Sequence, residues 1–356
     1  MTSTRPAYTH PVAQQAHALS QVIDGHNDLA WSSRTVAGYT VEGLDGPEHP
    51  FRTDINLLRA GGVGAQFWSV YSRGGLAPSE AVQYTLEQID FVHRLVRRYP
   101  DTFVLARTGT EIRTAWERGQ IASLLGAEGG NSIGGSLAVL RVLAALGVKY
   151  LTLTHNHNTT WADSATDVRA HGGLTGFGRE VVAEMNRLGV LADLSHGSFE
   201  TMRQTFDVSS APVIFSHSSC HQVCPHPRNV PDDVLGRLST NGGVLMVAFV
   251  PEFVSADYWD WHDGGKHGTR PPVTVDQVAD HIEHAREVAG IDHVGLGSDY
   301  DGGGDFPDGM GDVGGFAVLI DRLAERRWNA PELAKLMGGN ILRVLDDTAE
   351  ATVTNA

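Results

Sequence analysis

The feature that most constrains the fold of this 356-residue chain is a regular alternation of short apolar runs with amphipathic stretches. The stretches 79–98 and 274–289 have the period of helices, and the second opens with Thr274 and Gln277 at the spacing of a capping box. Parallel strands joined by crossover helices give this pattern. The eight apolar runs are residues 21–26, 62–70, 121–128, 150–155, 190–196, 212–218, 243–249 and 293–299.

Eight buried parallel strands predict an α/β fold, a closed (β/α)8 barrel of the TIM type, although an open doubly wound sheet has the same local pattern. A further apolar run at 102–107 has no place among the eight barrel strands. We expect it to form a peripheral strand or a segment beside a helix. No linker divides the chain. We therefore expect a single domain at 21–345, an N-terminal extension at 1–20 and a polar, mobile tail at 346–356.

Charge and composition limit which binding partners and which cellular compartment we expect for this chain. Lys and Arg number 27 against 42 Asp and Glu, a formal net charge of −15, which disfavours nucleic acid or an anionic membrane as partner. We find no signal-peptide core, no run near the roughly 20 apolar residues of a membrane span and no hydrophobic anchor tail. The two cysteines, Cys220 and Cys224, give no disulfide framework. We expect a cytoplasmic protein, and the sequence leaves a homodimer open.

Six of the eight apolar runs end in a side chain that can bind a metal or move a proton. In a barrel, the C-terminal ends of all strands face one mouth, so these distant positions would converge. A satisfied buried polar group is the alternative for any one of them, but six such ends are hard to obtain by accident. The residues are Asp24, His26 and Asp28 at the end of the first run, then Glu128, His155, His196, His217 and Asp299.

Histidines and carboxylates gathered in one mouth form a ligand set that suits Zn²⁺. His26 and Asp28 are two residues apart, so on an extended segment both side chains would reach one ion. Glu128 has two carboxylate oxygens and could bridge two ions. The sequence thus predicts a metal centre at the C-terminal ends of the strands.

Longer strings resemble the motifs of the membrane (renal) dipeptidase family, binuclear zinc peptidases of the amidohydrolase superfamily. The resemblance runs from about residue 21 to about residue 345. It is carried by 24–29 (DGHNDL), 127–130 (AEGG), 150–155 (YLTLTH) with Asn158, 161–163 (WAD), 193–196 (DLSH), 215–219 (FSHSS), 228–235 (RNVPDDVL) and 297–302 (GSDYDG).

The resemblance implies a zinc-dependent dipeptidase and leaves the choice between L-L and L-D dipeptides open. It implies two Zn²⁺ per chain, bridged by Glu128 and by a water or hydroxide that acts as nucleophile. The ligands that it implies are His26 and Asp28 for one ion, His196 and His217 for the other, and Glu128 for both.

The resemblance also implies three roles in catalysis and substrate binding. Asp299 would act as general base and then as general acid. His155 would contact the substrate and stabilise the oxyanion of the tetrahedral intermediate. Arg228 would bind the terminal carboxylate of the dipeptide through paired donors, whereas a salt bridge to Asp232 or Asp233 is the alternative.

Three positions depart from the family pattern, and one of them is His157, which stands where a cysteine is common. Phe253 stands where we expect a tyrosine that contacts the substrate carboxylate, and Asn131 replaces the usual histidine after Gly130. A related reaction on N-acyl amino acids, lactones or β-lactams therefore stays open, as does a non-catalytic metal-binding barrel.

Several aromatic and histidine residues lie outside these motifs. The segment 251–272, with Trp259, Trp261 and His262, is expected either to cover the mouth as a lid or to serve packing or oligomer contacts. His281 and His284 lie among charged residues of a predicted helix, so we expect both on a solvated face.

Overall fold

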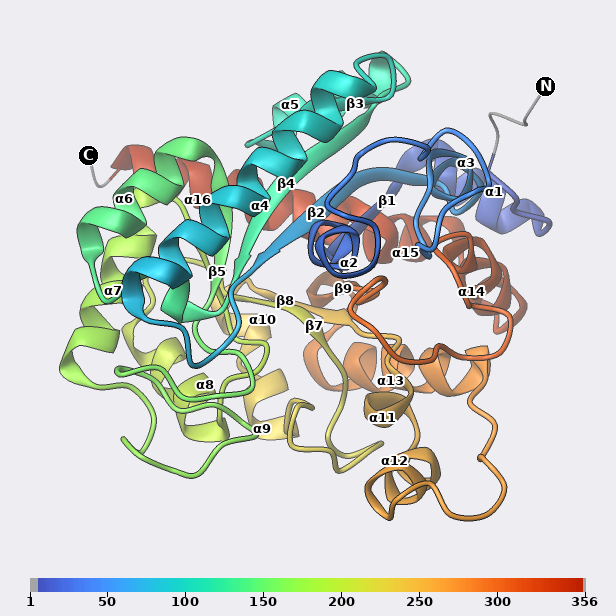
Figure 1. Ribbon diagram of the computed structural model, residues 1–356. Helices are drawn as coiled ribbons and strands as arrows, with labels where there is room; N and C mark the ends of the chain where they lie inside the picture. The colour runs from blue at the N-terminus through green and yellow to red at the C-terminus, as the bar shows by residue number, and fades with distance from the viewer. Residues whose placement is uncertain (1–5, 355–356) are drawn as a thin grey trace.

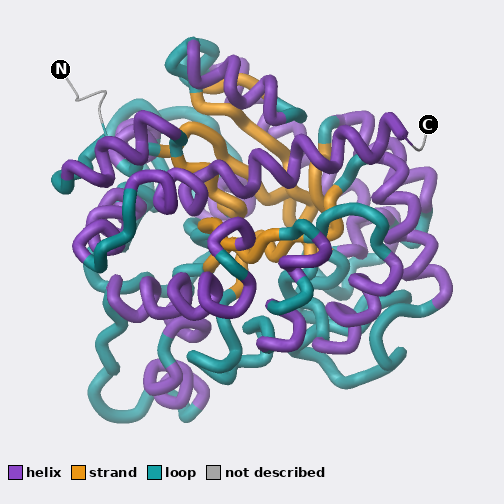
Figure 2. The backbone as a smooth tube through the Cα atoms, turned by 180° about the vertical axis from the view of Figure 1, so that it is seen from behind, coloured by secondary structure: helices purple, strands orange, loops and turns teal. Residues whose placement is uncertain are grey.

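The computed structural model describes the backbone of residues 6–354 and the side chains as far as residue 350. Its centre is a closed barrel of parallel strands with helices outside, drawn from opposite sides in Figures 1 and 2. Strand β2 closes the ring by pairing with β1 on one side and β4 on the other. The barrel strands are β1 Val22–Asn27, β2 Val63–Tyr71, β4 Ile121–Glu128, β5 Val148–Thr152, β6 Leu191–Asp193, β7 Ile214–Ser218, β8 Val244–Val247 and β9 Val294–Leu296.

All eight predicted strands occur, and the (β/α)8 barrel is confirmed. The apolar runs are uninterrupted because these strands are buried on both faces, against the barrel interior and against the helices. The ninth strand, β3 Phe103–Leu105, pairs with the first residues of β4 and lies outside the ring, beside α5 in Figure 1. The run at 102–107 is therefore a peripheral strand.

The helices cover the outside of the barrel. The predicted stretches 79–98 and 274–289 are helices α4 and α13, and the Thr274 amide donates to Gln277 Oε1 at 2.9 Å. No helix of the described chain is both long and apolar enough to cross a membrane. The helices are α1 Pro11–Leu19, α2 Leu29–Val36, α3 Ile55–Ala60, α4 Pro78–Arg98, α5 Gly109–Glu117, α6 Leu137–Leu146, α7 Gly176–Leu188, α8 Phe199–Val208, α9 Asp232–Leu235, α10 Leu238–Asn241, α11 Pro251–Val254, α12 Ala256–Asp263, α13 Val275–Ala289, α14 Gly315–Glu325, α15 Ala330–Ala334 and α16 Asn340–Thr354.

Both terminal segments contain helices that pack against the rest of the fold. Helix α1, within the predicted extension, buries Ala13 and Ala16, and it packs against α15. Helix α16 continues through the predicted tail as far as Thr354, so the tail is helical over the described residues. The helical period of the apolar face continues from Val344 to the buried Thr348, which keeps this helix on the barrel. Residues 1–5 and 355–356 lie outside the described residues.

The structure also corrects the position predicted for His281. Its ring is fully buried, with Nδ1 accepting from the Cys220 amide and Nε2 donating to the Val254 carbonyl, both at 3.0 Å. Burial lowers its pKa to about 4. The solvated face predicted for His281 was wrong because the helical period places it between the buried Val278 and Ala285. His284 is partly buried and contacts Asp232 at 2.8 Å.

Two glycines allow the strand that carries His217 to approach strands β1 and β9 inside the barrel. A Cβ at Gly25 would lie 2.4 Å from the Ser216 carbonyl oxygen, and one at Gly297 only 1.8 Å from it. No side chain fits at either position without a shift of backbone. The two glycines thus set how closely the strand ends meet beneath the mouth.

Candidate metal centre and substrate cavity

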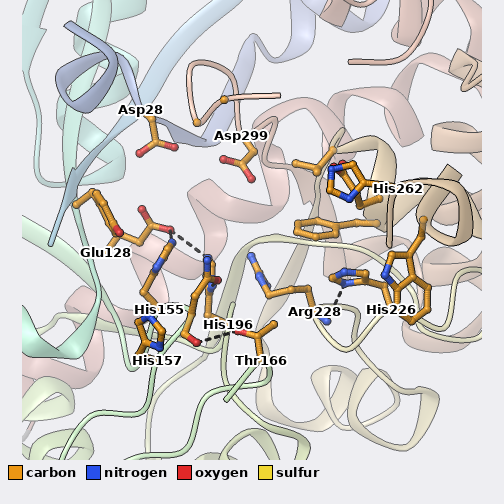
Figure 3. A pocket seen from close by; sticks show the side chains of 18 of the residues that line it. Asp28, Glu128, His155, His157, Thr166, His196, His226, Arg228, His262 and Asp299 are labelled. Carbon is orange, nitrogen blue, oxygen red and sulfur yellow. Dashed lines mark hydrogen bonds and ion pairs between the residues drawn. The ribbon is translucent and has the colours of Figure 1, made fainter. Parts of the chain in front are cut away.

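A cavity of about 660 Å³ opens at the C-terminal mouth of the barrel, and Figure 3 shows the side chains that line it. Two further site residues lie beneath its floor: His26 is 0% and His217 1% exposed. The structure thus brings together all eight of the predicted site residues. Those that line the cavity itself are Asp28, Glu128, His155, His196, Arg228 and Asp299.

Glu128 lies at the centre of this group. Its Oε1 lies 3.1 Å from His196 Nε2 and 3.5 Å from His217 Nε2, while its Oε2 lies 3.5 Å from His26 Nε2. Burial opposes ionisation of Glu128, but the adjacent His26 and His155 hold its pKa well below the ordinary range. Each oxygen of one carboxylate therefore faces a different set of ring nitrogens.

Asp28 completes the other side of the centre. Its Oδ2 lies 3.2 Å from His26 Nε2, and ligand atoms of His26, Asp28 and Asp299 all lie within 4.8 Å of one another. Asp28 is the N-cap of α2, with φ −96° and ψ 25°, so it is not on an extended segment. His26 and Asp28 do converge, but the turn after β1 brings them together, and not the alternation of a strand.

The donor set fits divalent cations. Burial keeps the pKa of His196 and of His217 well below the ordinary value, so both rings are neutral, the form in which imidazole binds a metal. Their Nε2 atoms lie 3.0 Å apart and point toward Glu128. His26 Nε2 is buried, makes no hydrogen bond and faces two carboxylates. Nitrogen and carboxylate ligands in such a cluster suit zinc and similar ions.

Three site residues follow their strands in turns. Strands β5, β6 and β9 end three residues before His155, His196 and Asp299, respectively. The backbone is left-handed at His196 (φ 65°) and at Asp299 (φ 68°), and a strand cannot continue through such a conformation. The predicted strands were therefore too long at these ends, although the side chains do reach the mouth.

Asp299 is a partly buried carboxyl beside the proposed ligands. Burial, with further contributions from Asp28 and Glu128, raises its pKa well above the ordinary value, while His26 opposes the rise. A cation in the site would favour the carboxylate form. A Cβ at Gly302 would lie 2.5 Å from Asp299 Oδ1 and 2.8 Å from Asp28 Oδ2, so this glycine keeps the space beside both carboxylates open.

Arg228 is a buried cation on the cavity wall. Its side chain donates to Ser218 Oγ and to the His217 carbonyl, both at 3.2 Å, and its Nε makes no hydrogen bond. Burial lowers its pKa to about 10, so it stays protonated at neutral pH. No carboxylate of the described residues forms a salt bridge with it; Asp233 pairs instead with Arg203. The alternative of a salt bridge to Asp232 or Asp233 is therefore not found.

The segment 251–272 forms one wall of this cavity. Phe253 lies beneath the Arg228 guanidinium at 5.0 Å, and the His226 ring packs against both Phe253 and Trp259. Glu252 and His262, 3.3 Å apart, also line the cavity. The segment thus lines the side of the mouth, while its Trp261 packs against Tyr258 at 5.3 Å between ring centroids.

Sequence reasoning missed several residues of the cavity. Tyr71 is the last residue of β2 and lies 4.6 Å from His155 between ring centroids. Its place at a strand end was the signal that could have identified it. Asn156 directly follows His155, and its Oδ1 lies 3.1 Å from His196 Nδ1.

The departure from the family pattern at Asn131 has a structural explanation, since its Nδ2 donates to Ser72 Oγ and to the Arg73 carbonyl, just after β2.

Comparisons with known proteins agree with this geometry. The chain matches the membrane dipeptidase family, peptidase family M19, over residues 12–356. It is 42% identical over 338 residues to the dipeptidase aclJ of Aspergillus oryzae, covering 92% of this chain and 78% of the relative. It is 40% identical over 344 residues to the dipeptidase verJ of Clonostachys rogersoniana, covering 93% and 85%.

Solved structures share the fold over almost their whole length. The metallopeptidase dipeptidase AC has a TM-score of 0.83 at 26% identity, covering 93% of this chain and 99% of that one. A metallopeptidase from Rhodobacter sphaeroides, bound to a phosphinate mimic of L-Ala-D-Ala, has the same TM-score and identity, with 92% and 99% covered. This chain therefore belongs to the membrane dipeptidase family and is a metallo-dipeptidase, a hydrolase that acts on peptide bonds.

Proposed function

We propose that this protein is a zinc-dependent dipeptidase whose five ligands hold two ions beneath the cavity. The observation that carries the proposal is the position of Glu128, with one oxygen toward His196 and His217 and the other toward His26. We assign His26 and Asp28 to one ion, His196 and His217 to the second, and Glu128 to both. Cations held there lower the pKa of a shared water and polarise the scissile carbonyl.

Asp299 is the proposed proton carrier. It lines the cavity within reach of the ligand group, and no lysine or arginine is paired with it among the described residues. In this role its carboxylate accepts the proton of the attacking water and returns it to the nitrogen of the departing amine. A buried site beside two other carboxylates favours holding that proton until the leaving group needs it.

His155 is the proposed donor to the developing oxyanion. Burial lowers its pKa, so the ring is neutral and keeps one N–H. Its Nε2 lies 3.6 Å from Glu128 Oε1 at the edge of the cavity. An N–H directed at the carbonyl oxygen from this edge stabilises the tetrahedral intermediate more than the substrate.

Arg228 is the proposed site for the substrate carboxylate. A buried guanidinium without an anionic partner in the described chain is costly unless a ligand supplies one. A free dipeptide supplies that charge, whereas an internal peptide bond does not. The L-Ala-D-Ala mimic bound by the Rhodobacter sphaeroides protein supports including L-D dipeptides in the proposed range.

A substrate panel tests this function. Hydrolysis rates would be compared for L-L and L-D dipeptides, their amides, N-acyl amino acids, lactones and β-lactams, with zinc content measured on the same preparation. We expect about two zinc ions per chain and the highest kcat/KM for free dipeptides. Higher activity on acyl amino acids or β-lactams would reassign the substrate class, and a zinc-free active enzyme would refute the metal centre.

A further inference from the structure

We infer that two buried hydroxyl groups, Ser216 Oγ and Tyr150 Oη, act as positioning residues that set the tautomers of His217 and His26. The inference rests on the proposed metal centre and goes beyond its ligands. A histidine binds a metal only through a ring nitrogen that carries no hydrogen. Which nitrogen that is depends on the group that contacts the other one.

The first relay begins at Asp193, the buried last residue of β6. Its Oδ1 accepts from the backbone amides of Ser195 at 3.1 Å and Ser216 at 2.8 Å. Its Oδ2 accepts from the hydroxyls of Thr152 at 2.5 Å and Ser216 at 2.6 Å. The single hydroxyl hydrogen of Ser216 is therefore committed to Asp193.

Ser216 can then only accept from its neighbour. Its Oγ lies 2.8 Å from His217 Nδ1, and since its own hydrogen points at Asp193, the ring nitrogen must carry the hydrogen of this contact. His217 Nε2 is left bare, on the side that faces His196 and Glu128. The relay thus presents the nitrogen that the proposed ion requires.

The second relay uses Tyr150, which is fully buried on β5. Its Oη lies 2.8 Å from His26 Nδ1 and 3.2 Å from the Gly25 carbonyl oxygen. The phenol donates to the Gly25 carbonyl, and in the arrangement that we infer its oxygen accepts from His26 Nδ1–H. His26 Nε2, which faces Asp28 and Glu128, is then the ring nitrogen left for the ion.

The two relays differ in what stands at their far end. The chain from His217 ends on the carboxylate of Asp193, whereas the chain from His26 ends on a neutral carbonyl. An anionic acceptor strengthens the hydrogen bonds leading to it and makes the ring a better donor to a cation. Loss of Ser216 should therefore weaken metal binding more than loss of Tyr150.

The experiment measures Zn²⁺ affinity by chelator competition on full-length Ser216→Ala and Tyr150→Phe, with thermal unfolding alongside. We expect each variant to weaken the binding of one of the two Zn²⁺ ions by about 10- to 100-fold. The loss should be larger in Ser216→Ala than in Tyr150→Phe. The ¹⁵N chemical shifts of the histidine rings should show mixed tautomers at the affected ring only.

Two matched controls remove a buried hydroxyl that touches no proposed ligand. Ser219→Ala removes a hydroxyl that donates to the Ala248 carbonyl at 3.3 Å, and Tyr8→Phe removes one that donates to the Gly61 carbonyl at 3.3 Å. Both should bind two Zn²⁺ with the affinity of the wild type. A loss of affinity in these controls equal to that in the test variants would overturn the inference.

Asp193→Asn tests the direction of the first relay with almost no change of shape. Its amide carbonyl can still accept the two backbone amides, so the amide nitrogen faces Ser216 and donates to it. The Ser216 hydrogen then turns to His217 Nδ1 and forces the wrong tautomer, so we expect a larger loss of affinity than in Ser216→Ala.

The outcomes separate this inference from the proposed function. A wild-type protein that binds no Zn²⁺ would refute the metal centre, and the relays with it. A wild-type protein that binds two, with Ser216→Ala, Tyr150→Phe and Asp193→Asn all equally tight, would leave the proposed function standing and overturn the inference.

Discussion

His196 and His217 face each other with their Nε2 atoms 3.0 Å apart, and Glu128 Oε1 lies 3.1 Å and 3.5 Å from these two nitrogens. At most one hydrogen can lie between the two rings, and the carboxylate beside them carries negative charge. Three electron-rich atoms directed at one point are the arrangement that a cation stabilises. This contact is the reason to expect that the enzyme depends on a metal.

Replacement of Glu128 by Gln should deplete both ions, because one residue serves both sites. Zinc per chain, measured by elemental analysis after dialysis, is expected to fall well below two, and hydrolysis should fall with it. Glu252→Gln is the control, since Glu252 lines the same cavity and pairs only with His262. Full zinc occupancy in Glu128→Gln would show that Glu128 does not bridge two ions.

Chelation should abolish hydrolysis in the wild type, and added Zn²⁺ should restore it, because Asp299 without the cations faces a water of ordinary pKa and an unpolarised carbonyl. The measurement is dipeptide hydrolysis before and after dialysis against a chelator. Full activity in the metal-free protein would exclude the proposed mechanism.

Asp299→Asn keeps the shape of the side chain but removes the proton acceptor. We expect kcat to fall by roughly 10²-fold or more with little change in KM or zinc content, which is the usual contribution of general acid–base catalysis. Asp301→Asn is the comparison: Asp301 Oδ1 accepts from the Arg52 amide at 2.9 Å in the adjoining turn. If Asp301→Asn lost kcat and Asp299→Asn did not, the two roles would be exchanged.

Arg228→Ala should weaken kcat/KM for free dipeptides by about 2–3 kcal/mol, because the substrate carboxylate loses a charged partner in a buried site. Dipeptide amides, which lack that charge, should lose much less. Arg203→Ala is the matched control, since it removes an arginine paired with Asp233 outside the cavity. Equal losses on acids and amides would contradict the carboxylate assignment.

The buried ring of His281 should make stability depend on pH. Its pKa of about 4 in the folded chain lies below the ordinary 6.5. The neutral ring therefore contributes fully above pH 6.5, and that contribution is lost as pH falls from 6.5 toward 4, since the unfolded chain binds the proton first. The gap corresponds to about 3 kcal/mol.

The variant His281→Gln isolates this contribution from other titrating groups. Urea unfolding at pH 7 and near pH 4 gives the difference in unfolding free energy between wild type and variant at each pH. We expect the advantage of the wild type to shrink at the lower pH. An advantage independent of pH would mean that His281 titrates normally in the folded chain.

The barrel could be predicted because its strands are buried on two faces and therefore appear in the sequence as uninterrupted apolar runs. The cluster around Glu128 could be predicted because ligand-type residues stand where those runs end. The left-handed turns at His196 and Asp299 could not, since histidine and aspartate adopt that conformation more often than most residues but still only in a minority of cases. The burial of His281 depends on the partners Cys220 and Val254, which are distant in the sequence.

The cavity wall at 251–272 leaves the barrel after β8 and returns at α13, and none of the proposed ligands lies within it. Figure 1 shows α11 and α12 in this excursion, on the lower side of the barrel. We therefore expect side chains of this wall to influence which substrates fit, without contributing a ligand to the proposed metal centre. Substitutions or insertions in this short stretch can change which substrate side chains the enzyme prefers. The proposed metal centre, which lies elsewhere in the chain, would stay intact.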